Sequence, residues 1–218
     1  KNDFSIDYFV VEMGAYIRGE IQRICELTPP HISIVVEVGP QHLERFGSLD
    51  NIATAKYEII KELPPDGVGV FNWDNPYVRE MANKGYPKTR LTVSKLVSPD
   101  APQGVRFVAS NISENLNGLS FVVTDTETKE SAKFETSLMG EHNVTNILLS
   151  TAVAVHEGMS LRDIALRVRS LRPAESRLVR QVIGGITIIN DAYSANPAGV
   201  VSALKSLSLK KKKKLVIT

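Results

Sequence analysis

The sequence contains one cysteine, one tryptophan and no long apolar run. The single cysteine, Cys25, cannot form a disulfide within the chain, so nothing in its cysteine content calls for an oxidising compartment. No apolar stretch approaches the roughly 18 residues of a membrane helix, and the N-terminus lacks the basic start and apolar middle of a signal peptide. We therefore expect a cytoplasmic protein that does not enter a membrane.

An excess of charge of one sign is also missing. The 218 residues include 26 basic and 24 acidic side chains, for a formal net charge of +2. This balance creates no field that would favour nucleic acid or an anionic membrane surface. Five lysines in a row at 210–214 are the exception. We interpret them as a solvated connector; the alternative is a nucleic-acid contact, which salt-dependent binding would reveal.

Short β-rich apolar runs alternate with amphipathic segments over the first hundred residues. The runs predict strands at residues 8–12, 32–38, 68–72 and 90–93. Apolar residues at steps of three and four predict helices at 48–63 and 77–83. With 43% hydrophobic residues, the chain can bury a substantial core. The alternation predicts an α/β fold with a mostly parallel sheet flanked by helices.

Between about residues 99 and 138 the pattern changes to short alternating runs, which predict a small antiparallel β insertion. Helical periodicity returns at 143–156 and 161–171, followed by expected strands at 178–183 and 186–191 and a helix at about 197–207. The chain ends in an apolar run at 215–218. We expect residues 1–214 to form one domain, truncated at its N-terminus, and residues 215–218 to begin a further domain that this chain lacks.

Three side chains in the first sixty residues are candidates for catalysis. Glu12 ends an apolar run, where a buried carboxylate needs a partner, and carboxylates are usual ligands of Mg²⁺. His42 lies in the loop GPQHLERFGS, between a buried strand and the helix that carries Lys56. Ligands of open α/β sheets gather at the carboxyl ends of strands, which is where this loop lies. The alternatives are a salt bridge for Glu12, a surface or packing role for His42, and an ordinary exposed helix lysine for Lys56.

Four segments in a fixed order are more specific than any single residue. They are EMGA followed by GEI from residue 12, GPQHLERFGSLDNIATAKYEI from residue 39, GEHNVTN from residue 140 and DAYSANP from residue 191. In content and order they resemble the Mur ligase family, from about residue 8 to the end of the chain. Within that family, EMGA and DAYSANP look most like the branch that adds D-alanyl-D-alanine.

The resemblance implies an ATP-dependent ligase that joins D-alanyl-D-alanine to a UDP-N-acetylmuramoyl tripeptide through an acyl phosphate, in peptidoglycan precursor synthesis. It implies ATP and Mg²⁺ as cofactors, and the UDP-muramoyl-peptide and D-alanyl-D-alanine as partners. We expect a monomer that binds neither nucleic acid nor membranes. A Mur ligase for another amino acid, and a Mur-like binding module without activity, are the alternatives.

The same resemblance implies roles for individual residues. Glu12 and His42 correspond to Mg²⁺ ligands, and Lys56 matches the lysine that the family commonly carries as a carbamate. Carbamylation turns a cation that would repel Mg²⁺ into an anion with two oxygens that can hold it. These three residues are the expected catalytic and metal-binding centre.

Four further residues are expected to bind the nucleotide. By resemblance Asn146, helped by Asn143, contacts the adenine; the two amides lie three residues apart and so share one helix face. Helix capping is the alternative, and it suits Asn143 better than Asn146. Arg177 and Asp191 match the family's arginine near the phosphates and aspartate near the ribose. For each of these two residues, the alternative role is to form half of a structural ion pair.

The chain departs from the family pattern at three points. Glu37 stands where the family usually has asparagine, and Ser194 makes YSANP where YNANP is common, which leaves the exact substrate open. The phosphate-cradling loop G-x-x-x-x-G-K-[S/T] is absent from the sequence. In the family this loop precedes the EMGA segment, so we expect an N-terminal phosphate-binding unit outside this chain. By itself the chain is expected to be inactive.

Overall fold

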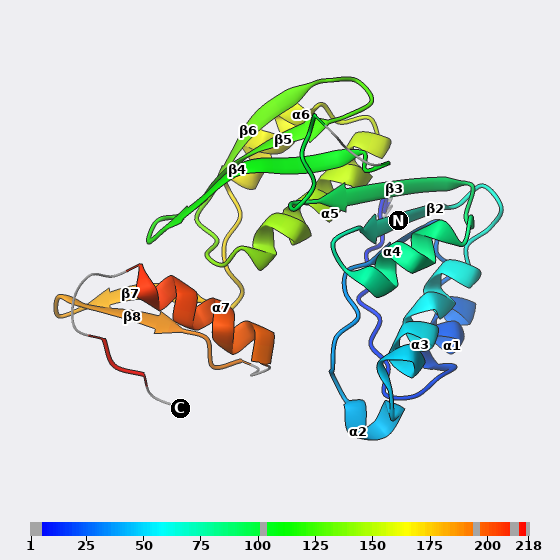
Figure 1. Ribbon diagram of the computed structural model, residues 1–218, viewed down its shortest axis with the longest axis horizontal. Coiled ribbons are helices and arrows are strands. Elements are labelled where there is room, and N and C mark those ends of the chain that lie inside the picture. Colours follow the sequence, from blue (N-terminus) through cyan, green and yellow to red (C-terminus); the bar gives the residue numbers. More distant parts are fainter. Residues whose placement is uncertain (1–5, 101–103, 194–196, 210–213, 217–218) are drawn as a thin grey trace, which may run out of the picture.

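The computed structural model describes residues 6–100, 104–193, 197–209 and 214–216 (Figure 1). Within them one sheet has six strands in chain order: β1 (Ile32–Val35), β2 (Val68–Asn72), β3 (Thr89–Ser94), β4 (Phe107–Asn115), β5 (Gly118–Asp125) and β6 (Ser131–Thr136). Strands β1 to β4 pair in parallel, and β4 to β6 pair antiparallel. The predicted α/β class is confirmed. The antiparallel insertion extends the parallel sheet, because β3 pairs directly with β4.

Helices cover both faces of the parallel part of this sheet. Helices α3 (Leu49–Lys61) and α4 (Pro76–Asn83) pack on one face and α5 (His142–His156) packs on the other. Helix α6 (Leu161–Val168) packs on β6, α1 (Glu20–Leu27) packs on α3, and the short α2 (Leu43–Phe46) precedes α3. In β2, Val70 belongs to the core beneath α5, whereas Phe71 belongs to the core beneath α3 and α4. Alternate side chains of this strand are thus buried on opposite faces, as expected for a parallel sheet.

Side-chain caps set where the helices begin. Ser48 precedes α3, and its Oγ accepts a hydrogen bond from the Asn51 N–H at 3.2 Å. Asn75 caps α4 in the same way, with Oδ1 3.2 Å from the Val78 nitrogen and Pro76 in the first turn. Caps of this kind satisfy backbone donors that have no partner inside the helix. Both helices therefore begin at a defined point, α3 after the short α2 and α4 shortly after β2.

A separate group of elements follows α6 (Figure 1). It contains the antiparallel pair β7 (Val179–Ile183) and β8 (Ile186–Asn190), and helix α7 (Pro197–Ser208). The strands turn at Gly184 and Gly185, whose φ angles of 57° and 79° favour glycine. Glu114 of β4 connects α7 to the main sheet, because its Oε1 accepts hydrogen bonds from the buried Ser206 hydroxyl at 2.7 Å and from the Gly140 N–H at 2.8 Å.

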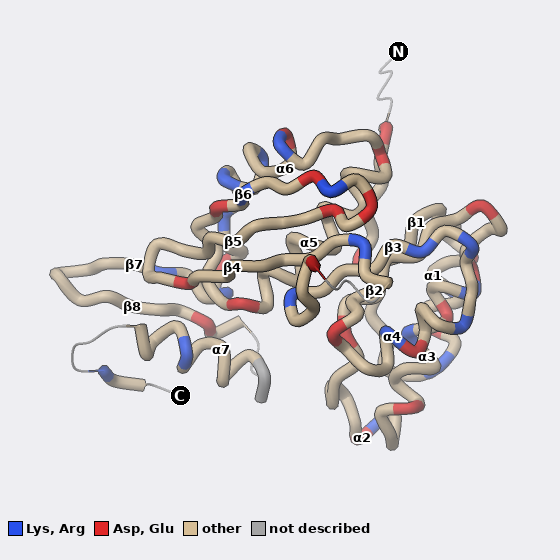
Figure 2. Tube along the Cα trace, turned by 45° about the horizontal axis from the view of Figure 1, so that its top comes forward, with Lys and Arg blue, Asp and Glu red and all other residues tan. Residues whose placement is uncertain are grey.

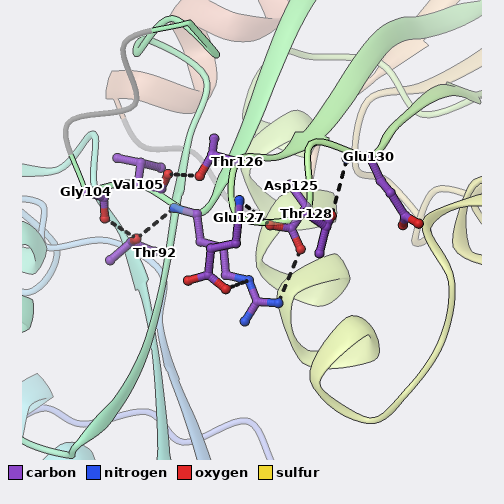
Figure 3. Close-up of polar contacts among 9 residues, drawn as sticks. Thr92, Gly104, Val105, Asp125, Thr126, Glu127, Thr128 and Glu130 are labelled. Atoms are coloured by element: carbon purple, nitrogen blue, oxygen red, sulfur yellow. Dashed lines mark hydrogen bonds and ion pairs between the residues drawn. The ribbon is translucent and has the colours of Figure 1, made fainter.

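A partly buried group of ion pairs lies where the chain passes from the parallel to the antiparallel strands (Figure 3). The Arg106 guanidinium lies 3.2 Å from the carboxylate of Asp125, which is 2% exposed, and 3.1 Å from the carboxylate of Glu127. The Thr92 hydroxyl accepts the Arg106 N–H at 3.1 Å and donates to the Gly104 carbonyl at 3.0 Å. These contacts connect β3, the segment entering β4 and the end of β5.

One predicted strand is wrong. Residues 8–12 have no regular secondary structure, and Tyr8, Phe9 and Val10 are 66%, 74% and 92% exposed. An apolar run forms a strand only where a sheet edge pairs with it, and none of the described strands does so here. Helices α1 and α2 were not predicted. They are short, and α1 buries only Ile21 and Cys25.

The expected strand at 215–218 is not seen where the chain is described, since residues 214–216 have no regular secondary structure. Residues 217 and 218 lie outside the described residues, as do the lysines at 210–213 and residues 194–196 of the DAYSANP segment. The domain boundary at residue 215 therefore stays a prediction.

Charged residues of both signs are interspersed along the sheet and its helices (Figure 2). In the part of the chain that the structure describes, no helix combines the length and the apolar character needed to cross a membrane.

Candidate functional site

A cleft of about 1930 Å³ runs along strand β1, from the amino ends of β1 and β2 to the carboxyl ends of the parallel strands β1, β2 and β3. Its walls come from these strands, from residues 7–16, from one face of α3, from both ends of α5 and from the segments next to β7 and β8. Open α/β sheets bind ligands at the carboxyl ends of their strands. Every site residue predicted from the sequence lines the cleft: Glu12, His42, Lys56, Asn143, Asn146, Arg177 and Asp191.

Hydrogen bonds between neighbouring strand ends shape this part of the cleft. Asn72, the last residue of β2, donates from Nδ2 to the Val36 carbonyl at 2.9 Å. The Asp74 carboxylate accepts hydrogen bonds from the Ser94 hydroxyl and, at 2.9 Å, from the Lys95 N–H. These bonds join the ends of β1, β2 and β3, and so give the ligand-binding edge a defined shape.

Lys56 lies half-buried on α3, and its Nζ donates a hydrogen bond to the Glu37 carbonyl at 2.6 Å. Burial lowers the pKa of Lys56, and the nearby Glu37 carboxylate opposes part of this change. A lowered pKa leaves more of the amine neutral near neutral pH. The neutral amine is the form that reacts with carbon dioxide to give a carbamate.

His42 lies exposed at the start of α2, with φ of 51° in the left-handed region. Its imidazole contacts the ring of Tyr16, with centroids 4.5 Å apart and planes at 62°. The Arg45 guanidinium lies 4.8 Å from the centroid of the same tyrosine ring. Glu12 is also exposed, and the ion pairs found among the described residues do not include it. The salt-bridge alternative for Glu12 therefore has no support in the described residues.

The donor set decides whether Mg²⁺ fits here. In the described part of the chain, no three His, Cys, Asp or Glu side chains group closely enough to hold a metal ion. Glu12 and His42 offer two donors, and Lys56 as an ammonium would repel a cation. As a carbamate, Lys56 would offer oxygen ligands of the kind that Mg²⁺ prefers. The residues thus fit Mg²⁺ when Lys56 is carbamylated.

Asn143 and Asn146 share one face of α5, as predicted. The Asn146 Nδ2 donates to the Asn143 Oδ1 at 3.3 Å, and the Asn143 Nδ2 donates to the Met139 carbonyl at 2.7 Å. The residue that precedes the helix is Glu141, so Asn143 lies inside the first turn and is not its N-cap. Asn146 is exposed at the cleft. The amides are thus held in a fixed relation to each other.

Arg177 lies shortly before β7 and Asp191 directly follows β8, so both lie at the end of this strand pair that is opposite its turn. The Arg177 guanidinium lies 4.3 Å from the ring centroid of Tyr193, and the Asp191 Oδ1 accepts the Leu178 N–H at 3.1 Å. Neither takes part in an ion pair among the residues described. Ser176 and Leu178, on either side of Arg177, have φ of 57° and 48°. For leucine this conformation is costly, and such strain concentrates at functional sites.

Comparison with known proteins identifies the family. Residues 2–154 match the family model described as the Mur ligase middle domain. The chain belongs to the Mur ligase family. A curated relative, the UDP-N-acetylmuramoyl-tripeptide--D-alanyl-D-alanine ligase of Mycobacterium tuberculosis, is 33% identical over 206 residues, which cover 93% of this chain and 38% of the relative.

Solved structures have the same fold as this Mur ligase middle domain. MurF from Acinetobacter baumannii superimposes with a TM-score of 0.80 at 26% identity, covering 91% of this chain and 42% of that protein. MurF from Thermotoga maritima, solved in complex with ADP, gives 0.74 at 23% identity, with 89% and 43% covered. The chain spans about two fifths of the length of the relatives it matches.

Two residues at the cleft of the Mur ligase middle domain were missed from the sequence. The His142 Nδ1 lies 3.2 Å from the Ser202 hydroxyl of α7, and the Lys95 Nζ donates to the Glu141 carbonyl at 3.1 Å. Desolvation, and then the charge of Lys95, lower the pKa of His142 although the side chain is partly exposed. Lys95 directly follows β3, and His142 lies inside the GEHNVTN segment. In the sequence, the position of Lys95 at the end of a strand and that of His142 inside a motif were the signals that could have identified these two residues.

Proposed function

We propose that this Mur ligase middle domain is the nucleotide-side part of an ATP-dependent ligase that joins D-alanyl-D-alanine to a UDP-N-acetylmuramoyl tripeptide, in the cytoplasmic synthesis of peptidoglycan precursors. The observation that carries the proposal is that residues from four separate sequence motifs line one cleft, and that this cleft includes the ligand-binding edge of the sheet. The name of the Mycobacterium tuberculosis relative supports this pair of substrates.

Amide formation from a free carboxylate needs activation. The carboxylate takes the γ-phosphoryl group of ATP, which releases ADP and gives an acyl phosphate; the amine then attacks the acyl carbon, and phosphate leaves as the amide forms. Neither step needs a covalent bond to the protein. The side chains of the cleft therefore act by positioning the reactants and by balancing charge.

Four residues are proposed to bind the nucleotide. Asn146 contacts the adenine, and Asn143 orients it through the hydrogen bond between the two amides. Arg177 offers a permanent positive charge for the phosphates, and Asp191 offers a carboxylate for the ribose hydroxyls. The ADP bound in the Thermotoga maritima structure supports the proposal that this fold binds a nucleotide.

Glu12, His42 and Lys56 in its carbamate form are proposed to hold Mg²⁺. When bound, Mg²⁺ neutralises charge on the phosphoryl group during transfer. The protein's own contribution is the half-buried position of Lys56, because burial lowers the pKa of its amine and so favours the neutral form that reacts with carbon dioxide. We further propose a monomer that binds neither nucleic acid nor membranes, in keeping with the net charge of +2.

ATP-dependent phosphate release by the full-length protein tests the proposal. The assay uses UDP-N-acetylmuramoyl tripeptide as acceptor and compares D-alanyl-D-alanine with single amino acids as the amine. We expect turnover only with the dipeptide. Turnover with a single amino acid would assign the protein to a sister ligase, and no turnover with any amine would favour a Mur-like module without catalytic activity. The 218-residue chain alone is expected to be inactive.

A further inference from the structure

Tyr16 lines the cleft beside His42, and the Arg45 guanidinium contacts the Tyr16 ring. Neither residue belongs to the proposed metal ligands. The edge-to-face contact between the Tyr16 and His42 rings, with centroids 4.5 Å apart, has the geometry that aromatic pairs prefer. No hydrogen bond from a described residue reaches the ring nitrogens of His42, which is exposed. The tyrosine ring is therefore the neighbour best placed to set the direction of the imidazole.

The backbone around Tyr16 is itself held in place. The N–H groups of Tyr16 and Ile17 both donate to the Glu20 carboxylate, at 2.6 and 3.1 Å. Three residues after Tyr16, the Gly19 N–H donates to the carboxylate of Glu58 at 2.7 Å. Glu58 lies on α3, two residues after Lys56. The segment that carries the tyrosine is thus connected to the helix that carries the proposed carbamate.

Arg45 contacts both His42 and Tyr16. It lies three residues after His42, and its N–H donates to the His42 carbonyl at 2.9 Å. Its guanidinium lies 4.8 Å from the centroid of the Tyr16 ring, within the range of a cation–π contact. The tyrosine ring thus contacts two side chains of the same short segment, which limits its own freedom to rotate.

We propose that Tyr16 is a positioning residue that fixes the direction of the His42 imidazole, and that Arg45 keeps the Tyr16 ring in place. This inference rests on the proposed role of His42 as a metal ligand. An imidazole without a fixed direction must be ordered when it binds a metal, and neighbours that orient such a ligand strengthen metal binding. Neither Tyr16 nor Arg45 needs to touch the metal.

Mn²⁺ binding to the full-length protein, measured by electron paramagnetic resonance in bicarbonate buffer, tests this role. Tyr16→Leu should weaken binding about 2- to 10-fold, because it removes the aromatic contact. Tyr16→Phe keeps the ring and should retain the affinity. Lys84→Gln is the matched control: it removes a cation–π contact with Tyr57, at 4.6 Å, and should leave Mn²⁺ binding unchanged. His42→Ala shows the loss expected when the ligand itself is removed.

A second measurement needs no metal. The ring signal of His42, labelled with ¹³C and identified by its loss in His42→Gln, should show greater ring motion in its ¹³C relaxation in Tyr16→Leu and unchanged relaxation in Tyr16→Phe. If His42→Ala weakens Mn²⁺ binding and Tyr16→Leu does not, the positioning role is wrong and the proposed function stands. If His42→Ala leaves Mn²⁺ binding unchanged, the metal role of His42 fails and the inference fails with it.

Discussion

The Nζ of Lys56 donates a hydrogen bond to the backbone carbonyl of Glu37 at 2.6 Å, which connects the start of the cleft loop to helix α3. This contact holds the lysine at the carboxyl end of β1. The negative charge of the Glu37 side chain partly offsets the effect of burial on the pKa of Lys56. The environment of this lysine therefore combines burial, which favours the neutral amine, with a nearby negative charge, which opposes this effect.

Lys56→Arg in the full-length protein should lower kcat by about 100- to 1000-fold, the usual cost of losing one group that stabilises transition-state charge. A guanidinium cannot form the carbamate and keeps its positive charge next to the proposed metal ligands. Phosphate release under saturating substrates measures the effect, with an unchanged unfolding midpoint as the control. Full activity in this variant would exclude the carbamate role.

Asn146→Leu should raise the KM for ATP about 10-fold, the equivalent of one lost hydrogen bond, and leave the KM for D-alanyl-D-alanine unchanged. The reason is that leucine cannot pair with the adenine edge. Ser150→Ala, one turn further along α5, is the matched control, because the Ser150 hydroxyl donates to the Asn146 carbonyl and leaves the Asn146 side chain unchanged. An increase confined to the KM of the dipeptide would refute the adenine role.

His142 should make stability depend on pH in a defined direction. Its pKa in the folded protein lies below the ordinary value of 6.5, chiefly because of desolvation. Between the folded and unfolded pKa values the unfolded state binds more protons, so stability rises with pH there. The stabilisation that the lowered pKa of His142 provides is fully present above about pH 6.5, and it is lost as the pH falls through the pKa of His142 in the folded protein.

Urea midpoints at pH 7.5 and 5.5 check this expectation. His142→Gln should lose less stability than the original protein over this interval, because glutamine does not titrate. His31→Gln removes an exposed histidine and serves as the control. An equal loss in the original protein and in His142→Gln would show that other groups cause the pH dependence.

Asp125→Asn should destabilise the protein by about 1–2 kcal/mol, because it removes the buried anion beside the partly buried Arg106 guanidinium, which keeps its pair with Glu127. Thermal or urea unfolding measures the change. Lys133→Gln, which breaks the exposed pair with Glu135, should shift the midpoint much less, since solvent screens that pair. Equal effects of the two substitutions would contradict the importance of burial.

Local patterns predicted most of the parallel part of the fold. The strand at 68–72 and the helix after Ser48 agree with the structure, because strand periodicity, helix periodicity and side-chain caps depend on neighbouring residues. Residues 8–12 show the limit of such patterns. They have the composition of a strand, but a strand also needs a partner at a sheet edge, and local sequence does not specify that partner.

The sequence by itself determined the family, through four motifs in a fixed order, and with it the candidate ligands of metal and nucleotide. Only the tertiary structure decided their surroundings: Tyr16 against His42, Lys56 bonded to Glu37, and Glu114 bonded to Ser206, 92 positions away. Contacts of this kind depend on how strands and helices pack. A motif therefore predicts which side chains are needed, and packing decides which neighbours orient them and shift their pKa values.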